Sequence, residues 1–113
     1  MRTVTGNIIL PANISAPQTG HVLVEVRDVS LADAPSALVA EKWLENIPLQ
    51  PHGHIPFKIC VPEVAPNRTL SLRVHISLDR SGRMNAGDLL TTTSYTIPNT
   101  GDVTLPEVVV VVI

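Results

Sequence analysis

Residues 71–78 read SLRVHISL, an alternation of polar and apolar side chains without a break. Apolar residues at every second position are typical of a β-strand with one buried face and one solvated face. We therefore predict a strand over residues 69–79, with its apolar side chains toward the core. Its polar side chains, among them that of His75, are expected to lie in water.

The rest of the chain repeats this theme on the scale of one domain. The chain has 113 residues, the size of an ordinary domain. Its residues are 44% hydrophobic but only 3% aromatic, so the core has to be built from Val, Ile and Leu, and β-branched residues favour strands. Ten prolines and six glycines leave little room for long helices. We expect a single all-β domain over residues 1–113.

Six further segments carry strand signals between turn residues. Proline lacks the amide donor that a central strand needs, so Pro56 places its segment at a sheet edge, or the strand starts after it. Val22, Val24 and Val26 are expected in the core and Glu25 in water, whereas residues 37–44 could also form two helical turns. Short strands at near-regular spacing predict an antiparallel β-sandwich of about seven strands, with a closed barrel as the alternative. The six segments are residues 3–10, 21–29, 37–44, 54–61, 88–97 and 107–113.

The C-terminal run Val108–Ile113 is apolar throughout. An unbroken apolar run of this length is typical of a strand that is buried on both faces. Left unpaired, such a strand would be an aggregation hazard. We therefore expect it to be paired inside the sheet or, alternatively, inside an interface with a partner.

Charge and hydropathy bear on partners and compartment. The formal net charge is −2 and no basic block is present, so nucleic acid is not an expected partner. No apolar run approaches the length of a transmembrane segment. The start of the chain lacks a signal-peptide pattern, which predicts a cytoplasmic protein if Met1 is native and a periplasmic or outer-membrane-associated one if a leader was removed. Cys60, the single cysteine, is expected to be a small packing residue.

The chain shows no motif for catalysis or for metal binding. His52 and His54 could supply two ligands, but zinc sites need three or four, and we expect no metal. Residues 79–88 resemble a calcium loop only faintly, because Arg80 and Arg83 bring positive charge where acidic ligands are needed. There is no nucleophile elbow and no phosphate-binding glycine loop. We therefore expect neither an enzyme nor a bound cofactor.

Residues 26–35, VRDVSLADAP, and residues 36–41, SALVAE, form the most specific motif of the chain. Together they resemble the signature of the YbaY/YscW family of small bacterial lipoproteins and type III secretion pilotins. Residues 54–57, 72–76 and 88–95 extend this resemblance over nearly the whole chain. The resemblance implies a compact β-sandwich. For the best-understood members it also implies an outer-membrane pilotin, which binds a short segment of a secretin subunit and aids its delivery and assembly.

The block at residues 28–35 also has a structural interpretation. Asp and Ser side chains bond to nearby backbone amides, and Pro35 fixes the direction of the chain. The block is therefore predicted to shape a crossover between strands, and the substitution Asp33→Ala is expected to lower stability.

The functional hypothesis is a non-enzymatic module that holds a peptide segment of a partner protein in an apolar groove or at a sheet edge. Leu23, Trp43 and Leu44 are the candidate contacts, because they can lie off the main core and tryptophan is enriched at interface hot spots. The alternative place for Trp43 is the core. The alternative function is a self-associating structural β-domain, which would form a homo-oligomer through an edge strand or through its C-terminus.

Overall fold

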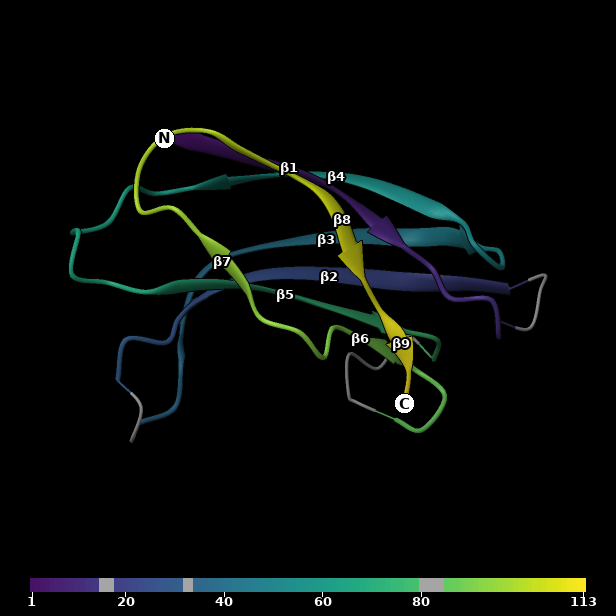
Figure 1. Ribbon diagram of the computed structural model, residues 1–113. Coiled ribbons are helices and arrows are strands. Elements are labelled where there is room, and N and C mark those ends of the chain that lie inside the picture. The colour runs from purple at the N-terminus through teal and green to yellow at the C-terminus, as the bar shows by residue number, and fades with distance from the viewer. Residues whose placement is uncertain (15–17, 32–33, 80–84) are drawn as a thin grey trace.

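The computed structural model describes residues 1–14, 18–31, 34–79 and 85–113, which form nine strands in two sheets (Figure 1). The two sheets lie face to face as layers, and their apolar side chains form one core between them. The all-β sandwich predicted from the sequence is confirmed. It has two strands more than expected, because two of the expected segments each divide.

The smaller sheet, sheet A, has the strand order β4-β1-β8. β1 lies in the middle, antiparallel to β4 and parallel to β8. A parallel neighbour has to arrive from a distant part of the chain, because parallel strands need a long connection. The other strand pairs in the described residues are all antiparallel. The bounds are Arg2–Ile9 for β1, His54–Val61 for β4 and Val103–Val109 for β8.

The larger sheet, sheet B, has the order β3-β2-β5-β6-β9, and β7 also pairs with β5. β3 is a strand rather than helical turns, and it continues beyond its predicted end at Leu44. The expected strand at residues 88–97 is divided, because the chain leaves the sheet between β6 and β7. The bounds are Gln18–Asp28 for β2, Ala37–Leu49 for β3, Leu70–Ser77 for β5, Leu89–Leu90 for β6, Tyr95–Ile97 for β7 and Val111–Val112 for β9.

The core is aliphatic, as the composition predicts, and it follows the strand alternation. Val22, Val24 and Val26 of β2 are fully buried, and β5 contributes Val74 and Ile76 beside them. Burying one such side chain stabilises the fold by about 1.5–3 kcal/mol. The strand predicted from residues 71–78 is therefore the middle of sheet B and turns its apolar row to the core.

The outer face of sheet B is less exposed to solvent than expected. Glu25 is only 8% exposed and His75 only 5%, so the prediction that they lie in water is wrong. The Arg27 guanidinium covers Glu25 and donates to its carboxylate at 2.7 Å and to the Ser36 hydroxyl at 2.6 Å. His75 is covered by the loop before β6, where its Nε2 lies 3.0 Å from the carboxylate of Asp88. Loops that fold back over the sheet produce this burial, and strand alternation alone does not predict them.

One side of the sandwich is closed by a chain segment that changes sheets. β8 pairs with β1 in sheet A, and the chain then continues as β9 beside β6 in sheet B (Figure 1). Val108 and Val110 are fully buried, whereas Val109 is 45% exposed. The run is therefore not buried on both faces as predicted, because only one face of the crossing segment meets the core. Its pairing inside the sheets is confirmed. We call this side the closed edge.

The opposite side is formed by β3 and β4, which are edge strands of sheets B and A. The turn at residues 50–53 joins them, and the Gly53 amide donates to the Gln50 carbonyl at 2.9 Å. The Leu10 amide donates to the Gly53 carbonyl at the same distance, which ties the turn to the end of β1. Pro56 lies on an edge strand, as predicted. We call this side the open edge, since no strand crosses between the sheets here in the described part of the chain.

Candidate functional site

Two adjoining hollows lie along the open edge, between β3 and β4. They share Leu44 and Pro56, and their volumes are about 470 and 540 Å³. Together they form an elongated depression, which we call the β3–β4 groove. Pockets that hold ligands usually measure about 300–1,000 Å³, so each hollow is large enough to accept side chains of a partner.

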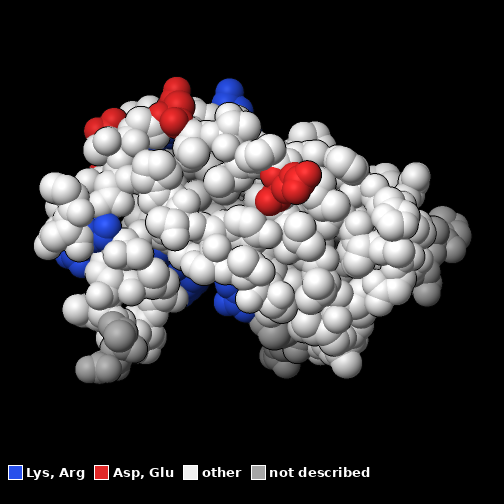
Figure 2. Space-filling model, in the orientation of Figure 1, with Lys and Arg blue, Asp and Glu red and all other residues white. Residues whose placement is uncertain are grey.

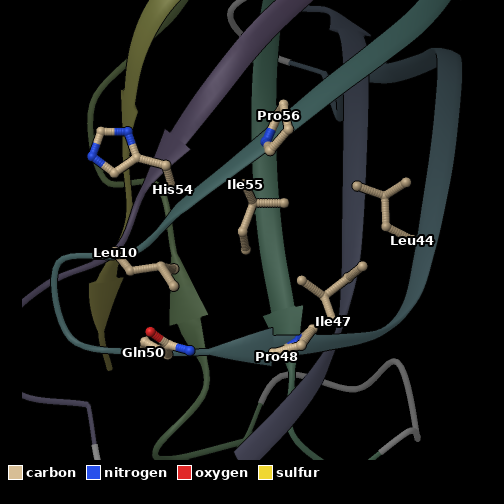
Figure 3. Close-up of a pocket in the computed structure, with 9 residues that line it drawn as sticks. Leu10, Leu44, Ile47, Pro48, Gln50, His54, Ile55 and Pro56 are labelled. Atoms are coloured by element: carbon tan, nitrogen blue, oxygen red, sulfur yellow. The ribbon is translucent and has the colours of Figure 1, made fainter.

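The first hollow is apolar and lies beside the turn that joins β3 to β4 (Figure 3). Leu44 and Ile47 come from β3, and they face Ile55 of β4 and Leu10, which follows β1. Ile55 and Leu10 are buried, whereas Leu44 and Ile47 are only partly covered. A partner that binds here would remove this partly covered apolar surface from water, and that burial stabilises the complex.

A β-bulge in β3 brings Leu44 and Ile47 to the same face. Leu44 pairs with Val22 and Ile47 with Gly20, so β3 has one residue more than β2 over this interval. Asn46 takes up the extra residue with a φ of 54°. Asparagine tolerates this left-handed conformation better than most residues. The bulge thus widens the apolar surface that β3 presents to the groove.

The second hollow has a mixed lining. Phe57 and Ile59 are buried side chains of β4, whereas Glu41, Lys42 and Lys58 are exposed. An apolar partner side chain could therefore rest against the buried pair while a polar or charged group meets the exposed ones. Cys60 also lines this hollow and is exposed, so the prediction of a buried packing residue is wrong.

The predicted contact residues fall on two different surfaces. Leu44 lines the groove. Leu23 and Trp43 pair directly across β2 and β3, on the outer face of sheet B. Trp43 is 43% exposed, so the alternative in which it fills the core is wrong. The structure thus brings Leu23 and Trp43 together and separates them from the apolar hollow.

Sequence reasoning missed several groove residues, among them Ile47 and Ile55. The expected strand ended at Leu44, because the bulge at Asn46 breaks the two-residue period. Ile55 lies on a correctly predicted strand, but its place across from β3 depends on how the sheets stack. The available signal was Pro56, which marks β4 as an edge strand and therefore as a strand with a free side.

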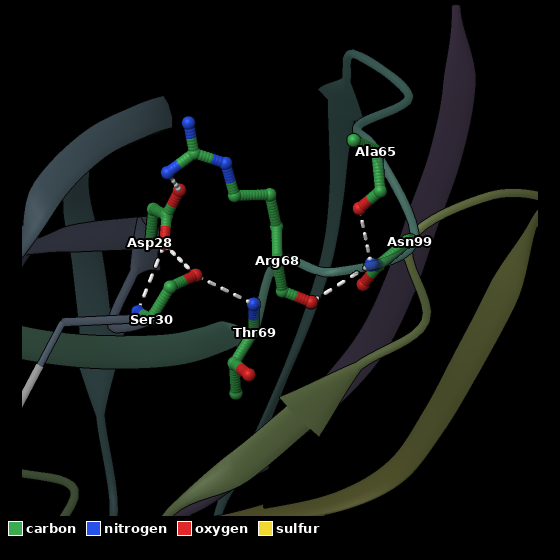
Figure 4. A network of polar contacts seen from close by, with 6 residues as sticks. All are labelled: Asp28, Ser30, Ala65, Arg68, Thr69 and Asn99. Carbon is green, nitrogen blue, oxygen red and sulfur yellow. Dashed lines mark hydrogen bonds and ion pairs between the residues drawn. The ribbon is translucent and has the colours of Figure 1, made fainter.

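A polar network near one end of the sandwich accounts for the 28–35 block (Figure 4). The Ser30 hydroxyl and amide both donate to the Asp28 carboxylate, and Thr69 donates its amide to the Ser30 hydroxyl at 2.8 Å. The Ser30 hydrogen bonds, together with Arg68 at 3.3 Å, hold the pKa of the Asp28 carboxyl below its usual value. The expected bonds from Asp and Ser to nearby amides are confirmed. Asp33 lies outside the described residues, so its effect on stability stays a prediction.

The same network fastens the loop that leads into β5. The Asn99 side-chain amide donates to the carbonyls of Ala65 and Arg68, at 2.7 and 2.8 Å (Figure 4). These bonds join three loops into one rigid end, and they satisfy backbone acceptors rather than offering free groups to a ligand. We therefore interpret the network as a structural feature of the fold and not as a ligand-binding site.

Other kinds of site find little support in the described residues. Residues 1–14, 18–31, 34–79 and 85–113 hold no cluster of three side chains that could bind a metal ion. His54 instead shares a 2.7 Å hydrogen bond with Asn7. Residues 80–84 of the faint calcium motif lie outside the described part. Charged side chains are sparse on the face shown in Figure 2, and most of that surface is uncharged. No helix in the described ranges is long and apolar enough to cross a lipid bilayer.

The chain is similar to proteins of bacterial secretion systems. The sequence model of one protein family, described as type III secretion system lipoprotein chaperone (YscW), matches residues 1–105. Among solved structures, an alternative pilotin from the type II secretion system of Vibrio cholerae is similar, with 22% sequence identity and a TM-score of 0.68. That likeness covers 97% of this chain and 96% of the other, and it shows a shared fold. No curated protein matches the chain.

Proposed function

The chain belongs to the YscW family of type III secretion system lipoprotein chaperones, and we propose that it binds a segment of a secretin subunit in the β3–β4 groove. The observation that carries this proposal is the open edge, where Leu44 and Ile47 of sheet B remain partly uncovered beside the buried Ile55 of sheet A. In this function the chain is a binding module without catalytic activity. Among the predicted contact residues, Leu44 is the one that lines both hollows of the groove.

The free side of β3 supports an extended conformation for the bound segment. β3 pairs with β2 on one side only, so its backbone amides and carbonyls on the other side can pair with a partner. A peptide that adds to a sheet edge gains main-chain hydrogen bonds, and pockets along the edge select its side chains. The hollow at Leu44 and Ile47 provides such a pocket next to the free side of β3.

Leu23 and Trp43 form a second surface that a longer segment could reach around β3. Both lie on the outer face of sheet B, and Trp43 projects from the edge strand itself. Tryptophan is enriched among the few residues that carry most of the binding energy of an interface. We therefore keep all three predicted residues as proposed contacts, with Leu44 inside the groove and the other two beside it.

The proposal is tested by titrating the full chain with the purified secretin subunit in a calorimeter. Leu44→Asp and Ile47→Asp place a charge in the apolar hollow, and we expect each to weaken binding at least about tenfold. Val109→Asp is the matched control, because it adds the same charge to an exposed valine of the closed edge. Circular dichroism has to show that all three variants are folded. Unchanged affinity in the two folded groove variants would refute the proposal.

Self-association through β3 is the second candidate function, and the same free strand side supports it. The route through the C-terminus has less support, because Val108 and Val110 are buried in this chain's own core. Glu41→Pro removes a backbone donor from the free side of β3, because the Val74 carbonyl faces β6 and the alternation of paired residues then turns the Glu41 amide away from β2. If the chain dimerises through β3, light scattering will show a dimer for the wild type and a monomer for this variant.

A further inference from the structure

Lysine is confined to one place in this molecule. The chain contains only two lysines, Lys42 and Lys58, and both line the second hollow of the β3–β4 groove. Lys42 comes from β3 and Lys58 from β4, so each sheet contributes one lysine to the lining of the same hollow. Both side chains are exposed.

Neither lysine forms an ion pair with another described residue. The ion pairs in the described residues join Arg27 to Glu25, Arg68 to Asp28 and His75 to Asp88. Glu41 also lines the hollow, but no ion pair links it to a lysine in the described part of the chain. The residues that line the hollow thus include two lysines and one glutamate, with one positive charge in excess.

The position of this charge along the groove is defined by β3. Lys42 lies two residues before Leu44, and two residues of a strand span about 6.6 Å. Residues two apart on a strand point to the same side, so an extended partner that follows β3 would present alternate side chains to the groove. A side chain in the apolar hollow at Leu44 is then followed, two residues along, by one that meets the lysines.

We propose that the β3–β4 groove selects an extended segment in which an acidic residue lies two positions from an apolar residue. The apolar side chain fills the hollow at Leu44 and Ile47, and the carboxylate lies between the ammonium groups of Lys42 and Lys58. This inference rests on the proposed function and specifies the chemistry of the partner. The four-carbon stems of the lysines let both ammonium groups reach one carboxylate.

Lysines on edge strands have a second effect, because they also discourage strands of other molecules from pairing with the edge. The two effects make different predictions. A lysine that recognises a carboxylate discriminates between Glu and Gln in the partner. A lysine that only protects the edge makes no such distinction, and its removal promotes self-association.

The test begins with overlapping twelve-residue peptides that span the secretin subunit, bound to the full-length chain. The strongest binder that contains Glu is then synthesised in three forms, with Glu, Gln or Lys at the acidic position. The fluorescence of Trp43, the only tryptophan, reports binding because this residue lies on β3 between Lys42 and Leu44. Lys42→Gln and Lys58→Gln remove one charge each. Arg73→Gln is the matched control, because it removes a charge from the outer face of sheet B.

We expect each lysine substitution to weaken binding of the Glu peptide about fivefold and that of the Gln peptide less than about twofold. Arg73→Gln should leave both affinities unchanged. A variant with Lys42→Glu and Lys58→Glu should prefer the Lys peptide, which a purely structural role of the lysines would not produce. Higher salt should weaken binding of the Glu peptide more than that of the Gln peptide.

Other outcomes overturn the inference. If the strongest binders contain no acidic residue, or if the lysine variants bind the Glu and Gln peptides alike, the groove does not select acid and the proposed function still stands. If the lysine variants dimerise in light scattering and peptide affinity is unchanged, the lysines only protect the edge. If no peptide binds, the proposed function fails and the inference fails with it.

Discussion

The closed and open edges of the sandwich are both built from apolar residues, but these residues differ in how far they are buried. At the closed edge the chain crosses from β8 in sheet A to β9 in sheet B, and Val108 and Val110 are fully buried. At the open edge only a turn joins the sheets, and Leu44 and Ile47 remain partly uncovered. Apolar composition alone therefore does not separate core from binding surface. What separates them is whether a strand of the same chain covers the gap.

The closed edge is also fastened by hydrogen bonds that join the end of the chain to the segment before β6. The Gly87 amide donates to the Ile113 carbonyl at 2.7 Å, and the Ile113 amide donates to the Asp88 carbonyl at 2.9 Å. The Asp88 carboxylate in turn accepts the amides of Leu78 and Asn85. The closed edge is thus held together within the chain, whereas the open edge leaves one side of β3 available for a partner.

The largest effect is expected where a charge enters the closed edge. Val108→Asp places a carboxylate in the core without a partner, and we expect it to lower the free energy of unfolding by about 4 kcal/mol. Val109→Asp is the control, because the neighbouring side chain faces solvent and should change stability by no more than about 0.5 kcal/mol. Urea unfolding followed by circular dichroism measures both. Equal losses would mean that the run does not alternate between core and solvent.

The next effect concerns Asp88, which holds the loop before β6 against the closed edge. Asp88→Ala removes acceptors for the amides of Leu78 and Asn85 and the contact with His75, and we expect a loss of about 3 kcal/mol. Asp102→Ala, which removes a single exposed bond to the Thr3 amide, should cost about 1 kcal/mol. Hydrogen exchange should become faster in β6 and β9 but not in β3. Equal acceleration in β3 would argue against two independent edges.

A smaller effect on stability, which appears only at acidic pH, is expected at the end of the sandwich between the two edges. Because the pKa of the Asp28 carboxyl is lowered in the folded state, its contribution to stability is complete above the ordinary value of 3.8 and is lost as the pH falls through the lowered pKa. Ser30→Ala removes the hydroxyl that lowers this pKa most. Melting temperatures measured between about pH 6 and pH 2 should therefore fall less steeply in the variant. A steeper fall would contradict this assignment.

The smallest effect on stability is expected at the open edge. Trp43→Ala should lower the free energy of unfolding by less than about 1 kcal/mol, because the side chain is far from fully buried. Replacing a tryptophan in a core would cost about 3–5 kcal/mol. Acrylamide should quench the fluorescence of the free protein strongly. Weak quenching together with a large loss of stability would place Trp43 in a packed environment and remove it from the proposed contacts.

Local patterns predicted the strands well wherever one face meets the core and the other meets solvent. Residues 54–61 were predicted with the bounds that β4 has, and Pro56 correctly placed that strand at an edge. The uniform run at the C-terminus was harder, because a stretch that is apolar throughout carries no period. Which of its side chains are buried is decided by the sheet change after β8, a tertiary feature.

The candidate site could be predicted only in part. Leu44 was predicted as a contact because it can lie off the main core, and the structure places it in the lining of the groove. Ile47 was missed because the bulge at Asn46 shifts the period by one residue. The facing residue Ile55 belongs to the other sheet, and its position opposite β3 follows from the turn at residues 50–53. No spacing in the sequence encodes that position.

The parallel pair of β1 and β8 has a consequence for the order in which the chain can fold. Val4 lies opposite Val103, so the two strands are separated by most of the sequence. A chain that emerges with its N-terminus first can pair β1 with β4 early, but β1 then waits for β8 until nearly all residues have appeared. Contacts between such distant segments form slowly, because a long loop has to close first. Sheet A therefore stays incomplete until β8 has emerged, and a shorter chain leaves one side of its first strand open to other molecules.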